Sequence, residues 1–120
     1  MANHTLLSAS SLEGDQVKNR QGEDLGKIKE IMIDTETHNV AYYVLSFGGI
    51  MGMGDDLFAI PPEAMRVDTA DECFILNVDK EQLKKAEGFD KDHWPDMADP
   101  KFRRNIYQQY GISEGASRRH

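Results

Sequence analysis

The chain has 120 residues, of which 39% are hydrophobic and 29% are charged, and its formal net charge at pH 7 is −7. This length supports a single hydrophobic core, because roughly 100–150 residues is the commonest size of one domain. Acidic residues outnumber basic ones by 21 to 14, which disfavours nucleic acids and anionic membranes as partners, since both are bound through clustered Lys and Arg.

The first strong strand signal covers residues 26–34. Ile31 and Ile33 alternate along it as the two faces of a strand require, whereas Ile28 is out of phase with them. A β-bulge near Lys29-Glu30 would bring all three isoleucines to one face. We therefore expect a bulged strand whose isoleucines face the core.

A polar loop, residues 34–39, connects to the strongest predicted strand, residues 40–47. The apolar side chains of this strand fall on both alternations, so both of its faces are expected to be covered. In the loop, His38 or Asn39 is expected to adopt the left-handed conformation, since neither is β-branched. The longest apolar stretch, residues 40–45, is far shorter than the roughly 20 residues of a spanning helix, and no membrane span is predicted.

Residues 48–54 contain four glycines in seven positions, which favours a loop over a strand or helix. They match neither the P-loop nor the dinucleotide-binding fingerprint. The large apolar residues of this loop are Ile50, Met51 and Met53. Two interpretations stay open: the loop folds back as a plug over the mouth of the fold, or it forms an adaptable contact surface, for which methionine is well suited.

Three further short strands are predicted, at residues 57–60, 65–67 and 73–78, the first ended by Pro61-Pro62. Cys73 is the one cysteine of the chain and cannot form an intrachain disulfide. It is expected to be a small buried residue, in keeping with a reducing compartment. Residues 1–5 lack the pattern of a secretory signal peptide, so a cytoplasmic location is expected.

The pattern then changes to helix. Asp79 and Gln82 form a capping-box pattern at the start of a short helix. Asp99-Pro100 has the N-cap and first-turn proline of a second helix, in which Phe102 and Ile106 begin a stripe at a spacing of four. These helices form a C-terminal arm, followed by residues expected to fray.

No catalytic constellation is found in the sequence. None of the four histidines, at positions 4, 38, 93 and 120, has a second ligand at a zinc-site spacing. The acids Asp90, Asp92, Asp96 and Asp99 lack the EF-hand register and are expected to be solvated loop acids or helix caps. We therefore predict no enzymatic activity, no cofactor and no metal site.

Six or so short strands within about sixty residues indicate a mainly β fold, a small barrel or curled sheet with a helical C-terminal extension. A core made by these strands would bury the following eight side chains: Ile31, Ile33, Val44, Leu45, Phe58, Ile60, Phe74 and Leu76.

Four segments, in this order and spacing, resemble a known family: residues 22–28, 32–34, 40–49 and 57–61. The family is the PRC-barrel, named for the cytoplasmic part of the photosynthetic reaction-centre H subunit, which also includes a domain of the ribosome maturation factor. Residues 88–97 are similar to the ending of stand-alone bacterial members. The resemblance implies a β-barrel used for binding or assembly, with no catalytic residues to carry over. Thr37-His38 departs from the Thr-Gly that is frequent in this hairpin.

We expect three parts: a PRC-like β-barrel at residues 1–79, a C-terminal arm at residues 80–111 that packs on its own or a neighbour's barrel, and a flexible tail at residues 112–120. The predicted function is a non-catalytic protein-binding or assembly module. Two states stay open for it: a self-associating chain, expected as a homodimer, and a monomer whose arm docks on its own barrel. The alternatives are a small-ligand or metal sensor in or beside the barrel, and an enzyme whose site is formed across a dimer. The candidate interface residues are Ile50, Met51, Met53, Phe89, Trp94, Phe102, Ile106, Tyr107 and Tyr110.

Overall fold

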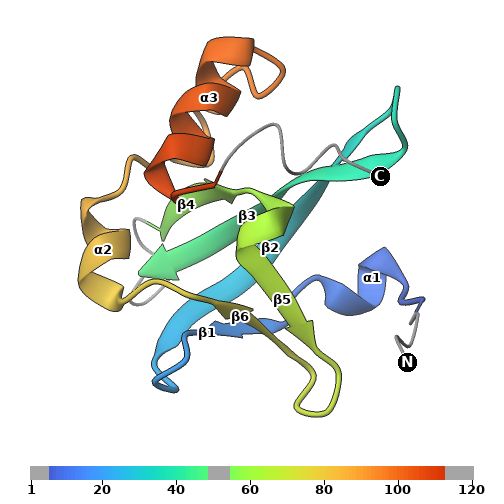
Figure 1. The fold of residues 1–120 in the computed structure, drawn as a ribbon, viewed down its shortest axis with the longest axis vertical. Helices are drawn as coiled ribbons and strands as arrows, with labels where there is room; N and C mark the ends of the chain where they lie inside the picture. The colour runs from blue at the N-terminus through green and yellow to red at the C-terminus, as the bar shows by residue number, and fades with distance from the viewer. Residues whose placement is uncertain (1–5, 49–54, 113–120) are drawn as a thin grey trace.

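A computed structural model describes residues 6–48 and 55–112 (Figure 1). Six strands form one sheet in the order β4-β3-β2-β1-β6-β5, which curls into a half-barrel. Neighbouring strands are antiparallel except β1 and β6, which are parallel. The strands are β1 (Gln16–Lys18), β2 (Asp24–Asp34), β3 (Asn39–Gly48), β4 (Asp55–Ile60), β5 (Met65–Asp68) and β6 (Cys73–Leu76). The predicted fold class, mainly β with a helical C-terminal extension, is confirmed.

Short helices fill the ends of this sheet. They are α1 (Ala9–Leu12), the 3-10 turn η2 (Pro62–Ala64), α2 (Lys80–Lys85) and α3 (Pro100–Gln109). The predicted capping box of α2 is present, because Asp79 and Gln82 each bind the backbone N–H of the other. Asp99 caps α3 as predicted, and Pro100 occupies its first turn. Among helices of the described ranges, none has the length and apolar character that crossing a bilayer requires.

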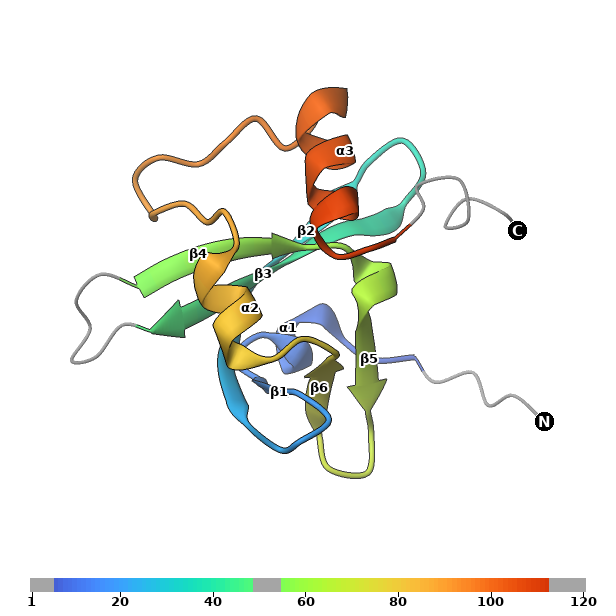
Figure 2. The same ribbon diagram turned by 60° about the vertical axis from the view of Figure 1, so that its left-hand side comes forward.

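The sheet is covered on both faces, by two separate apolar clusters. The inner cluster fills the half-barrel and includes Leu83 of α2; its other buried members are Val17, Leu25, Ile28, Leu45, Phe58, Ile60, Phe74 and Leu76. The outer cluster joins Tyr42 and Ala59 of the sheet to Ile106 and Tyr107 of α3. In Figure 2, α3 is at the top of the molecule, above β3 and β4, and the β5–β6 hairpin is at the bottom. The expectation that residues 40–47 are covered on both faces is therefore confirmed.

Most of the predicted core is buried, with one error. Six of the eight predicted side chains are buried: Val44, Leu45, Phe58, Ile60, Phe74 and Leu76. Ile31 is partly buried against the inner cluster. Ile33 is 51% exposed, so its predicted burial is wrong.

The exposure of Ile33 has a clear cause in the strand pairing. The predicted bulge is present between Ile28 and Glu30, but the β2–β3 register shifts a second time between Met32 and Ile33. In addition, β4 ends opposite Tyr43, and β1 ends opposite residue 27 of β2. The tip of the β2–β3 hairpin therefore projects beyond its neighbouring strands, and Ile33 has Val40 of β3 opposite it but no third strand beside it in the described sheet.

The hairpin turn adopts the conformation predicted for it. His38 has a φ of 64°, so it occupies the left-handed region in which glycine is frequent. Asp34 holds the turn, since its carboxylate accepts a hydrogen bond from the N–H of Glu36 at 2.9 Å. Its carbonyl oxygen also accepts one from the N–H of His38 at 2.7 Å. The predicted loop residues Ile50, Met51 and Met53, and the tail from residue 113, lie outside the described residues.

Candidate interaction surface

The C-terminal arm is attached to the sheet through Phe89. The N–H of Leu57 donates to the carbonyl oxygen of Phe89 at 2.8 Å, and the N–H of Phe89 donates back to that of Leu57 at 2.8 Å. Together they form an antiparallel bridge on the outer edge of β4. Gly88 permits this approach, because a Cβ atom there would lie 2.8 Å from the Leu57 oxygen and 2.9 Å from the ring of Phe58. The bridge protects an otherwise open strand edge.

Apolar packing and a hydrogen bond to Glu63 both hold helix α3 on the outer face. Ile106 and Tyr107 are 4% and 1% exposed, and the ring of Phe102 meets that of Tyr42 edge-on at 5.8 Å. The Tyr107 hydroxyl donates to a carboxylate oxygen of Glu63 at 2.8 Å. This bond ties the helix to η2, far from it in the sequence.

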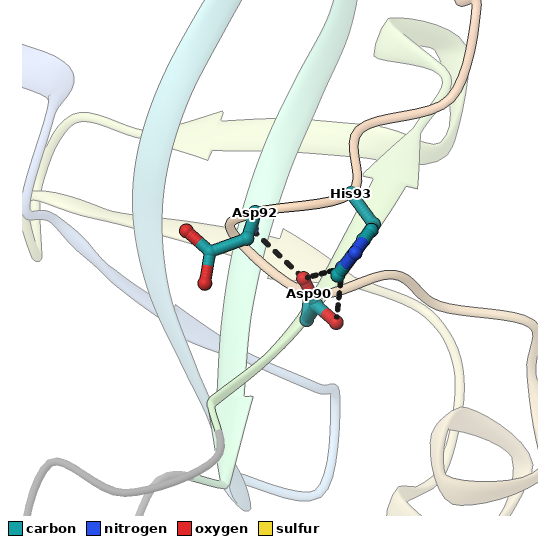
Figure 3. Close-up of polar contacts among 3 residues, drawn as sticks. All are labelled: Asp90, Asp92 and His93. Atoms are coloured by element: carbon teal, nitrogen blue, oxygen red, sulfur yellow. Dashed lines mark hydrogen bonds and ion pairs between the residues drawn. The ribbon is translucent and has the colours of Figure 1, made fainter.

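The loop before α3 is organised by its acidic residues (Figure 3). The carboxylate of Asp90 lies 2.8 and 3.0 Å from Nδ1 of His93 and accepts from the N–H of Asp92 at 2.8 Å. The His93 contact, followed by the Asp92 N–H, lowers the pKa of Asp90. Asp96 accepts from the N–H of residue 98 in the same way. Asp90, Asp92 and Asp96 are exposed and Asp99 caps α3, so the prediction of solvated loop acids or helix caps is confirmed. Within the residues described, no three His, Cys, Asp or Glu side chains form a metal-holding group.

The predicted interface residues of the arm differ in exposure. Ile106 and Tyr107 are buried within the chain. Phe89, Phe102 and Tyr110 are partly buried against the outer cluster. Trp94 alone among the six is exposed, at 38%, and its ring lies 5.1 Å from that of Phe89. In this conformation, Trp94 is the residue of the set that can contact a partner most directly.

A second surface, which sequence reasoning missed, lies on the outer face of β1, β6 and β5. Lys18 of β1 pairs with Ile75 of β6, and Ile75 pairs with Arg66 of β5. Two adjoining cavities, of about 280 and 510 Å³, share Arg20, Arg66 and Ile75 among their lining residues. We call the surface formed by Lys18, Arg20, Arg66 and Ile75 the basic groove. The signal in the sequence was the alternation of Lys18 with Val17 and of Arg66 with Val67.

Two titratable side chains, Cys73 and Tyr110, border the basic groove, and burial raises the pKa of both. Cys73 is buried, and its pKa is raised by that burial and then by the charge of Asp68. A thiol with a raised pKa is a poor nucleophile, and the prediction of a small buried cysteine is confirmed. Burial also raises the pKa of Tyr110 to about 12.

The chain was compared with protein families, with curated proteins and with solved structures. A family model described as the PRC-barrel domain matches residues 4–83. Among the solved structures that match is one of a protein assigned as the 16S ribosomal RNA processing protein RimM of Pseudomonas aeruginosa, with 19% identity and a TM-score of 0.42. The similarity covers 62% of this chain and 45% of that one, so it spans less than half of that protein's length. No curated protein matches the chain.

Proposed function

Because the chain belongs to the PRC-barrel family, we propose that it is a non-catalytic protein-binding module that also associates with itself. A bacterial cytoplasm is the setting we propose, in keeping with a single cysteine that is buried and free. The observation that carries the proposal is that Trp94 is exposed on a loop whose Phe89 is hydrogen-bonded to β4.

Trp94 has the properties of an interface anchor. Its ring rests on Phe89, and Phe89 is held to β4 by two backbone hydrogen bonds of 2.8 Å. The indole is thus presented on a fixed base with 38% of its surface exposed. Tryptophan is among the residues that contribute most to binding energy at protein interfaces, because a large apolar area is buried at small entropic cost.

Side chains of the types that serve catalysis have structural roles here. Asp90 closes a turn with His93, Asp99 caps α3, and Cys73 is buried with a raised pKa. These roles support a binding module over the alternative of an enzyme with a site across a dimer.

A second copy of the chain is the first partner to test. Most soluble oligomers are twofold dimers in which the same patch of each subunit meets its equivalent. Trp94 of one copy would then pack near Trp94 of the other, where two exposed indoles would be withdrawn from water together.

Sedimentation equilibrium of the full chain over the micromolar range tests this proposal. We expect a monomer–dimer equilibrium that Trp94→Ala weakens about tenfold or more. Ile33→Ala is the matched control, since it shortens another exposed apolar side chain and should leave the dissociation constant unchanged. A full chain that stays monomeric at high micromolar concentration would rule out self-association, and equal effects of the two variants would rule out the Trp94 surface.

A further inference from the structure

We infer that the basic groove on the outer face of β1, β6 and β5 binds an extended acidic segment of a partner protein, whose carboxylate is held by Arg20 and Arg66. This inference rests on the proposed function as a protein-binding module, and adds a second surface and the chemistry of its partner. The two surfaces are separate, because the Trp94 loop borders β4 and the groove reaches β5, the opposite ends of the sheet order.

The strand register aims the basic side chains away from the core. Val17, Phe74 and Val67 form one cross-strand row, and all three belong to or pack on the inner cluster. Successive residues of a strand point to opposite faces. The next row, Lys18, Ile75 and Arg66, therefore lies on the outer face.

The arginines of the groove have no charge partner within the chain as described. Neither Arg20 nor Arg66 takes part in an ion pair or side-chain hydrogen bond within residues 6–48 and 55–112. Both are exposed and line both cavities. In a chain with a net charge of −7, this is a local concentration of unpaired cations. A guanidinium binds a carboxylate through two parallel hydrogen bonds, which gives geometric selectivity as well as attraction.

The rest of the lining favours a peptide over a polyanion. Asp71 borders one cavity and Glu63 the other, so a chain of phosphates would meet a negative charge at each end. A segment with one or two carboxylates among apolar residues avoids this repulsion. Its apolar side chains would find Ile75 at the centre and Tyr110 and Ile112 towards α3.

The strand beside the groove can also pair with such a segment. β5 is the last strand of the sheet, and its ladder to β6 uses one edge only. In the part of the chain described, the one further backbone hydrogen bond that reaches Met65–Asp68 runs from the N–H of Met65 to the carbonyl oxygen of Pro62, so residues 66–68 have none beyond the ladder to β6. An extended peptide can add to such an edge through its main chain, while its side chains select the sequence.

Selection from a random-peptide display library on the full chain provides the probe. We expect the enriched peptides to carry Asp or Glu between apolar residues. The best peptide is then synthesised in that form and with the acids replaced by their amides, and the amide form should bind about tenfold more weakly or worse. In NMR titrations, the largest amide shifts should fall on residues 18–22, 65–68 and 73–78.

Matched variants locate the binding. Arg20→Gln and Arg66→Gln should each weaken the acidic peptide about tenfold. Arg104→Gln, an exposed residue of α3 that lines neither cavity, changes the charge equally and should have no effect. An unchanged thermal midpoint shows that each variant is folded.

The inference would be overturned if no peptide were enriched, if the enriched peptides lacked acidic residues, or if the NMR shifts fell outside the groove. It would also be overturned if inorganic phosphate displaced the peptide at a concentration below the dissociation constant of the peptide. Trp94→Ala should bind the peptide normally. Self-association without peptide binding would thus reject the groove alone, whereas peptide binding by a strictly monomeric chain would reject self-association alone.

Discussion

Gly26 of β2 lies where this strand approaches the backbone of β3 closely. Its φ of 125° belongs to a region that residues with a Cβ rarely occupy. A Cβ atom at this position would also overlap the backbone carbonyl oxygen of Ser46 on β3. Backbone conformation and close approach therefore both require glycine here.

Gly26→Ala should lower the free energy of unfolding by about 3 kcal/mol or more, since it combines backbone strain with a clash against main chain. Gly22→Ala is the control, because Gly22 also has a positive φ, of 86°, but no atom lies within 4 Å of the added carbon. That variant should cost about 1 kcal/mol. Urea denaturation measures both, and equal losses would show that the approach to Ser46 is unimportant.

Tyr107 of α3 and Tyr110, which caps the C-terminus of that helix, differ in whether their hydroxyl groups have a hydrogen-bond partner. The Tyr107 hydroxyl donates to Glu63 and accepts from Arg103 at 3.2 Å. The Tyr110 hydroxyl is buried without a hydrogen-bond partner among the described residues. Burial raises its pKa to about 12, and Gln109, which lies nearby without hydrogen-bonding geometry, opposes the shift. The two positions should therefore respond oppositely to removal of the hydroxyl.

Tyr110→Phe should be neutral or slightly stabilising at pH 7, whereas Tyr107→Phe should lower the free energy of unfolding by about 1 kcal/mol.

The effect of pH on the stability that depends on Tyr110 has a definite sign. The unfolded chain releases the Tyr110 proton near pH 10.0 and the folded chain near 12, so the stability that Tyr110 contributes is fully present below pH 10 and is lost as the pH rises towards 12. Wild type should lose up to about 2–3 kcal/mol more than Tyr110→Phe over this range. Parallel pH profiles of the two proteins would contradict the assignment.

At the scale of elements, local chemistry predicted helix ends well and strand ends less well. The caps at Asp79 and Asp99 depend on residues within three positions of each other, so the sequence contains all the information. The first bulge of β2 was visible for the same reason, in the phase of Ile28. The second register shift depends on Ala41 in the partner strand, and the sequence of β2 alone could not reveal it.

The basic groove is a second feature that the sequence alone could not reveal, because it too depends on pairing between strands. Lys18 and Arg66 lie on strands that meet only through β6, and the parallel pairing of β1 with β6 joins segments far apart in the sequence. Their charges seemed scattered along the chain because no local pattern brings them together. The aromatic arm, in contrast, could be predicted from apolar residues at helical spacing, such as Phe102 and Ile106. That spacing does not reveal which surface of the fold the helix packs against.

The docking of α3 is tested by shortening its most buried aliphatic side chain. Ile106 is 4% exposed between α3 and the sheet, so Ile106→Ala should lower the free energy of unfolding by about 2–4 kcal/mol. Ile33→Ala removes the same atoms from a side chain that is 51% exposed, and should change stability by less than about 0.5 kcal/mol. Thermal or urea unfolding compares them; similar small losses would mean that α3 does not dock in solution.

In the whole molecule, residues of the C-terminal arm are part of both apolar clusters of the half-barrel. Tyr110 packs against both the inner and the outer cluster. Leu83 of α2 is buried in the inner one, and Phe89 adds a bridge to β4. The family match ends at residue 83, yet these contacts continue beyond it. Contacts distributed in this way couple the stability of the two parts.

We therefore expect the arm and the half-barrel to unfold in one transition. Trp94 is the single tryptophan of the chain and its ring packs at a tilt against that of Phe89, so its fluorescence reports the arm, whereas the far-UV circular dichroism signal reports the secondary structure of the whole fold. In urea the two signals should give the same midpoint. Ile106→Ala should move both midpoints together to lower urea, because the outer cluster that it weakens includes Tyr42 and Ala59 of the sheet. A fluorescence transition that precedes the circular dichroism transition, or a variant that shifts fluorescence alone, would mean that the arm separates from a half-barrel that is stable without it.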